Sequence, residues 1–132
     1  MNLKPINIIL IILIFIVAGV YFGIFSNNSD IKKISAEDAK NNMENNSDII
    51  LLDVRTEEEN KEIRIPGSTL IPLDKLESNV EIVIPDKEKT IYVYCRSGNR
   101  SVSAVKILLK LGYKNVYDLG GINQWPYETI SN

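Results

Sequence analysis

The sequence predicts an α/β domain with a mostly parallel central sheet, preceded by a separate apolar helix. Along residues 31–132, short apolar runs typical of strands alternate with stretches of helical spacing. One of these runs, residues 49–52 (IILL), is apolar at every position, which is typical of a strand buried on both faces of a parallel sheet. By contrast, residues 6–25 form one long run without a charged side chain.

Five segments are expected to form the strands. Each combines apolar residues, several of them β-branched or aromatic, with turn signals at its ends. The segments are residues 31–34, 49–52, 69–71, 90–94 and 115–119. The fourth (TIYVY) gives the clearest strand signal, and the first is expected at an edge of the sheet.

Helices are expected between these strands, at residues 35–43, from residue 56 onward, at 74–78 and at 101–111. The first two begin with the sequences Ser35–Asp38 and Thr56–Glu59. Both resemble a capping box, in which a hydroxyl and a side chain three residues later satisfy free backbone amides. Gly112 stands where a helix-terminating glycine is expected. Residues 74–78 are expected to form only one helical turn, and a last short turn is expected near Trp125.

Residues 6–25 (INIILIILIFIVAGVYFGIF) have the length of a membrane-spanning helix, which needs about 20 apolar residues to cross roughly 30 Å of hydrocarbon. The sequence therefore predicts an uncleaved single-pass anchor over residues 1–25, a linker at 26–30 and a domain at 31–132. A cleaved secretory signal and a buried core helix are the alternatives. Lys4 precedes the run, as in a signal anchor, which favours a domain on the side away from the cytoplasm.

The residue counts exclude several kinds of site. The chain has no histidine, which removes Ser-His-Asp and Cys-His nucleophile pairs and histidine metal sites. Its one cysteine, Cys95, permits neither an internal disulfide nor a Cys-x-x-Cys zinc or redox site. The net charge of −2, with alternating signs, gives no sign of nucleic-acid binding. We expect no metal and no cofactor.

Cys95 and the residues that follow it form the candidate site. The cysteine directly follows the predicted strand 90–94, at the strand end where open α/β sheets bind ligands. The next residues are Arg96, Ser97, Gly98, Asn99, Arg100 and Ser101. Unpaired amides at the helix N-terminus and the two arginines would favour a nucleophilic thiolate and hold an anionic substrate. The serines add hydroxyls, and the glycine suits a tight loop. A buried, inert cysteine is the alternative.

Asp53 and Arg55 are a second pair of candidate residues. Asp53 directly follows the strand at residues 49–52. Because the carboxyl ends of parallel strands meet at one edge of a sheet, both side chains are expected near the edge that holds Cys95. A carboxylate and a guanidinium at this position are expected to support residues 95–101, the cysteine loop, by hydrogen bonds. A surface ion pair or simple turn chemistry is the alternative.

These segments together resemble the rhodanese homology domain, the thiosulfate sulfurtransferase family. The resemblance covers residues 31–132 and rests on segments 51–55 (LLDVR), 65–68 (IPGS), 95–101 (CRSGNRS) and 119–122 (LGGI) with Trp125. It implies a three-layer α/β/α fold, with Cys95 as the persulfide carrier and residues 96–100 as its cradle. Asp53 and Arg55 match the family's loop-supporting pair. One departure is Ile63-Arg64, where the family often has Gly-His.

The resemblance implies a sulfurtransferase that moves a sulfane sulfur through a persulfide on Cys95. The donor is expected to be a small anion such as thiosulfate, or a persulfide. The acceptor is expected to be an external thiol, a protein or cyanide, since the chain has no second cysteine. A non-catalytic, membrane-tethered sulfur carrier or partner-binding module is the alternative. A phosphatase is disfavoured, because such enzymes use Cys-x5-Arg, one residue longer than the spacing from Cys95 to Arg100.

Overall fold

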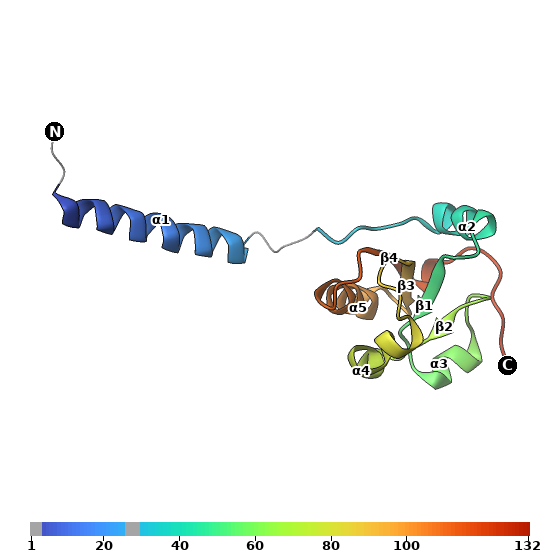
Figure 1. The fold of residues 1–132 in the computed structure, drawn as a ribbon. Helices are drawn as coiled ribbons and strands as arrows, with labels where there is room; N and C mark the ends of the chain where they lie inside the picture. Colours follow the sequence, from blue (N-terminus) through green and yellow to red (C-terminus); the bar gives the residue numbers. More distant parts are fainter. Residues whose placement is uncertain (1–3, 26–29) are drawn as a thin grey trace. The chain divides into compact units, whose positions relative to one another are not determined.

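The computed structural model describes the backbone of residues 4–25 and 30–132, and the side chains of residues 4–18 and 30–132. The chain divides into two units, with the boundary between Asp30 and Ile31. Helix α1 (Pro5–Phe25) belongs to the first unit, and all the strands belong to the second (Figure 1).

The membrane anchor predicted for residues 6–25 is corrected by the structure. In the described part of the chain, no helix is both long and apolar enough to cross a membrane. The correction extends to the single-pass location predicted for the protein, with its domain away from the cytoplasm.

The second unit is built on a four-stranded sheet in the order β2-β1-β3-β4, and every neighbouring pair is parallel. The strands are β1 (Ile50–Asp53), β2 (Thr69–Leu70), β3 (Thr90–Cys95) and β4 (Asn115–Gly121). The predicted α/β class and parallel sheet are therefore confirmed. The strand expected at residues 31–34 is reduced to one parallel bridge, from Lys33 to Asp118 beside β4.

Four α-helices and one 3₁₀ turn accompany these strands in the second unit. They are α2 (Ala36–Asn45), α3 (Glu57–Glu62), α4 (Leu73–Val83), α5 (Asn99–Lys110) and η1 (Ile122–Gln124). Helix α2 precedes β1, whereas α3, α4 and α5 connect successive strands, and η1 follows β4. Helix α2 is capped by Ser35, whose hydroxyl accepts the Asp38 amide at 3.1 Å. Helix α3 has the complete capping box predicted for Thr56 and Glu59.

Two helices extend beyond the residues expected from the sequence. Only one turn was expected within α4, but Leu76 and Val80, four residues apart, are buried on one face and favour the longer helix. Helix α5 begins at Asn99, two residues before the expected start, because Gly98 adopts the left-handed conformation (φ +106°) and turns the chain into the helix.

Apolar side chains of the strands face two separate cores, one on each side of the sheet. On one side Leu52, Val93 and Cys95 pack with α4 and α5. On the other side Leu51 and Tyr94 pack with Ala39 of α2 and with Ile122. Figure 1 shows these helices around the central sheet. Because neighbouring strand residues point to opposite faces, the side chains of Tyr94 and Cys95 lie on different sides of the sheet.

Candidate functional site

The turn between β3 and α5 holds the candidate nucleophile. Gly98, with its left-handed backbone, donates its N–H to the Sγ atom of Cys95 at 3.0 Å. The buried Ser101 donates its hydroxyl to the Gly98 carbonyl oxygen, also at 3.0 Å. The hydroxyl of Ser101 therefore holds the turn together, and the amide of Gly98 points at the sulfur.

Cys95 is buried, with 1% of its surface exposed, and belongs to the core shared with α5. Its sulfur is nevertheless in contact with a backbone donor. An N–H group at hydrogen-bonding distance stabilises negative charge that develops on its acceptor. Arg96, Ser97 and Asn99 are exposed around it, and Arg100 is partly buried.

The cysteine loop lies against the end of β4. Gly121 pairs with Cys95 in the sheet, and a Cβ atom on Gly121 would lie 2.8 Å from the Cα atom of Ser97. Gly120 precedes it with φ +89° and donates its N–H to Asp118 Oδ1 at 2.9 Å. The site predicted from the sequence does not include Gly120 and Gly121, although two adjacent glycines at the end of a strand are a signal of close backbone approach.

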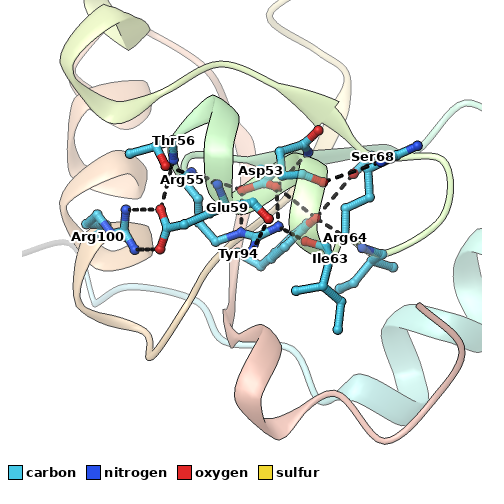
Figure 2. A network of polar contacts seen from close by, with 11 residues as sticks. Asp53, Arg55, Thr56, Glu59, Ile63, Arg64, Ser68, Tyr94 and Arg100 are labelled. Carbon is cyan, nitrogen blue, oxygen red and sulfur yellow. Dashed lines mark hydrogen bonds and ion pairs between the residues drawn. The ribbon is translucent and has the colours of Figure 1, made fainter. Parts of the chain in front are cut away.

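Asp53 and Arg55 form a buried ion pair, 0% and 2% exposed. Asp53 Oδ2 accepts hydrogen bonds from Arg55 Nη2 at 2.7 Å, Asn60 Nδ2 at 2.9 Å and the Tyr94 hydroxyl at 3.1 Å (Figure 2). Arg55 also donates Nε and its backbone N–H to Oδ1, at 3.0 and 2.9 Å. Burial opposes the charge of Arg55, but the bonds and the charge of Asp53 outweigh it and raise the pKa of the guanidinium.

This ion pair and the cysteine loop lie apart, because Asp53 pairs with Tyr94, on the face of the sheet opposite Cys95. Among the described residues, neither Asp53 nor Arg55 hydrogen-bonds directly to residues 95–101. The two groups are joined through α3 instead, as the contacts of Glu59 show. The candidate residues therefore gather into two clusters with a connection between them.

Glu59 makes that connection. Its carbonyl oxygen accepts Arg55 Nη1 at 3.3 Å, and its carboxylate accepts two hydrogen bonds from Arg100, each 2.8 Å long (Figure 2). The hydrogen bonds from Arg100 lower the pKa of Glu59 to about 2. The sequence predicts only a capping-box role for Glu59, because an ion pair between residues 41 positions apart leaves no local signal.

The segment around Arg64 also contacts the residues of the buried Asp53–Arg55 ion pair. The carbonyl oxygen of Ile63 accepts Arg55 Nη2 at 2.7 Å, and the N–H of Ile65 donates to the Tyr94 hydroxyl at 3.3 Å. The backbone of Arg64 pairs with Ile130 in an antiparallel bridge. Ile63-Arg64, which stands where the family often has Gly-His, therefore lies beside the buried pair of Asp53 and Arg55.

Comparison with known proteins gives consistent matches. A family model described as a rhodanese-like domain matches residues 35–128. The putative sulfurtransferase YtwF of Bacillus subtilis is 38% identical over 101 residues, covering 76% of this chain and 95% of that protein. The adenylyltransferase and sulfurtransferase uba4 of Ogataea parapolymorpha is 45% identical over 83 residues, 62% of this chain, but the match spans only 21% of that longer protein. A solved rhodanese-related protein from Thermoplasma volcanium is 32% identical, with a TM-score of 0.67, covering 76% of this chain and 99% of that one.

Proposed function

The chain is a member of the rhodanese-like domain family, and we propose that it is a sulfurtransferase that holds the transferred sulfur as a persulfide on Cys95. Relatives named as sulfurtransferases support sulfur transfer at the level of the family. The observation that supports Cys95 as the nucleophile is the 3.0 Å hydrogen bond from the Gly98 amide to its Sγ atom. This contact lies at the carboxyl end of β3, where α/β sheets bind their ligands.

In the first half-reaction, the Cys95 thiolate attacks the outer sulfur of thiosulfate. A sulfur–sulfur bond forms to Cys95, the sulfur–sulfur bond of thiosulfate breaks, and its electron pair leaves with sulfite. The Gly98 N–H, which already contacts Sγ, is placed to stabilise the negative charge of the persulfide. A persulfide donor would react in the same way, with a thiolate as the leaving group.

In the second half-reaction, an external nucleophile attacks the outer sulfur of the persulfide. Cyanide would leave as thiocyanate, and a thiol would leave as a persulfide, with the Cys95 thiolate restored in both cases. The acceptor must come from outside because the chain has no second cysteine. Separate half-reactions predict ping-pong kinetics.

The test is the intact mass of the full chain after exposure to thiosulfate and removal of excess reagent. We expect the wild-type protein to gain the mass of one sulfur atom and to lose it on addition of cyanide, with one thiocyanate released per chain. Cys95→Ser is expected to gain nothing. Lys106→Gln, a change at an exposed lysine of α5, serves as the matched control and should behave as the wild type.

Two results would contradict the proposal. One is sulfur uptake that persists in Cys95→Ser. The other is a wild-type chain that takes up no sulfur from either thiosulfate or a small-molecule persulfide.

A sulfur-carrier role is the second candidate function, and the burial of Cys95 favours it. Cys95 is only 1% exposed, so free small molecules reach its sulfur less easily than they would reach a surface thiol. A partner protein that opens the loop would receive the sulfur faster than a small acceptor. Steady-state thiocyanate production distinguishes the two functions, since a carrier would form its persulfide once and then turn over slowly with cyanide.

A further inference from the structure

We propose that the two arginines of the cysteine loop have different tasks: Arg100 holds the loop in place through Glu59, and Arg96 attracts the anionic donor. The proposal rests on the sulfurtransferase function proposed above and assigns donor recognition within that site. From the sequence alone, both arginines are expected to contact the substrate. The ion pairs of the described residues separate them.

The charge of Arg100 is already neutralised. Its Nη1 and Nη2 atoms donate to the two carboxylate oxygens of Glu59, and each hydrogen bond is 2.8 Å long. The two side chains are only 34% and 20% exposed, so this pair is less screened than one on the open surface. Because the pKa of Glu59 is about 2, its carboxylate is charged at neutral pH. Arg100 and Glu59 together therefore present no net charge to a donor.

Glu59 itself is held by several contacts at the start of α3. Its Oε2 atom accepts the Thr56 amide at 2.9 Å, and its own amide donates to the Thr56 hydroxyl at 3.2 Å. Its carbonyl oxygen also accepts Arg55 Nη1 (Figure 2). Turning Glu59 away from the loop would open the capping box, so Arg100 ties the first turn of α5 to a rigid point.

Arg96 differs from Arg100 in each of these respects. Its side chain is exposed and forms no ion pair with any residue that the structure describes. Its backbone is held, because its carbonyl oxygen accepts the Asn123 amide at 3.2 Å and lies against Gly121. Arg96 therefore offers an unneutralised positive charge on the residue next to Cys95.

The test compares the rates at which iodoacetate and iodoacetamide alkylate Cys95 in the full chain. Both reagents form a carbon–sulfur bond and release iodide, but only iodoacetate is an anion. The ratio of the two rates cancels changes in thiolate content and access, so it reports the local charge at the sulfur. This readout does not require sulfurtransferase activity.

We expect Arg96→Gln to lower the ratio of the iodoacetate rate to the iodoacetamide rate about threefold. This is the effect that one partly screened positive charge near the sulfur would have on an anionic reagent. The double variant Glu59→Gln/Arg100→Gln removes equal and opposite charges and should leave the ratio unchanged. Lys106→Gln removes an exposed charge from the same helix and should also leave it unchanged. A double variant that lowers the ratio as much as Arg96→Gln would overturn the proposal, and so would an Arg96→Gln variant without effect.

Sulfur transfer from thiosulfate to cyanide gives the second readout. Arg96→Gln should raise KM for thiosulfate with kcat nearly unchanged, whereas the double variant should lower kcat, because it frees the loop. If the double variant does not fold, Arg100→Lys replaces it. This change keeps the positive charge but loses the bidentate hydrogen bonds to Glu59. It should lower kcat at an unchanged alkylation ratio, and a higher KM at unchanged kcat would contradict the proposal.

The two readouts separate failure of this proposal from failure of the proposed function. A wild-type chain that takes up no sulfur, but whose variants follow the expected alkylation ratios, would overturn the sulfurtransferase function and support the assignment of the arginines. Normal sulfur transfer, with the double variant resembling Arg96→Gln in both measurements, would overturn only the assignment of the arginines.

Discussion

Gly121 lies so close to Arg96 that no side chain fits between them: a Cβ atom on Gly121 would stand 2.4 Å from the Arg96 carbonyl oxygen. The cysteine loop thus rests directly on the backbone of β4. Since the same carbonyl oxygen accepts the Asn123 amide, the loop cannot move aside without losing that hydrogen bond. The end of β4 therefore helps to determine where the amide of Gly98 meets the sulfur of Cys95.

Replacing Gly121 by alanine should displace the loop. We expect Gly121→Ala to slow persulfide formation about tenfold or more, because small misplacements of reacting groups are costly. It should also destabilise the fold by about 1–3 kcal/mol, as overpacking does. Mass spectrometry over time and denaturant unfolding measure the two effects. Gly112→Ala is the control: its φ of +94° costs about 1 kcal/mol, but it follows α5 at the far end from the loop and should leave sulfur uptake unchanged.

Removing the hydroxyl of Ser101 should loosen the turn at Gly98. Ser101→Ala deletes the 3.0 Å hydrogen bond to the Gly98 carbonyl oxygen. We expect a loss of about 1 kcal/mol in the free energy of unfolding and slower persulfide formation. Ser103→Ala, two residues further along α5 and exposed, should change stability by less than about 0.5 kcal/mol. Equal effects of the two changes would show that the buried hydroxyl has no special role.

Removing the carboxylate of Asp53 should destabilise the whole domain. Asp53→Ala leaves the buried guanidinium of Arg55 without its ionic partner. We expect a loss of about 3–5 kcal/mol, measured by denaturant unfolding, because an uncompensated buried charge is costly. Asp48→Ala breaks an exposed pair with Lys89 and should cost less than about 1 kcal/mol. A small effect at Asp53 would mean that water or another group reaches Arg55.

The ion pair between Glu59 and Arg100 predicts a specific pH dependence of stability. The pKa of Glu59 is lowered to about 2 in the folded chain, against 4.5 for an unperturbed glutamate. A lowered pKa stabilises the fold above the unfolded value, and this contribution is lost as pH falls through the folded value. Between pH 4.5 and 2, the wild-type chain should therefore lose on the order of 1–2 kcal/mol more than Glu59→Gln, after allowance for solvent screening. Parallel pH profiles for the two chains would contradict the prediction.

Several features of the fold could be predicted because they depend on neighbouring residues. The uniformly apolar run at residues 49–52 predicted a buried parallel strand, and the structure has β1 there. The two capping boxes predicted the starts of α2 and α3. The length of α4 could not be predicted in the same way, because its helical face is stabilised by contacts with α5 and the sheet. The apolar length of residues 6–25 led to a membrane prediction that the described structure contradicts.

By itself, the sequence determined the class of fold and the position of Cys95 between a strand and a helix, since periodicity and local order define both. Only the tertiary structure decided which partners the charged residues have. Glu59 meets Arg100 across 41 positions of sequence, while Asp53 lies on the face of the sheet opposite Cys95. These relationships depend on strand register and on how α3 packs beside the sheet, and no local pattern of residues encodes either one.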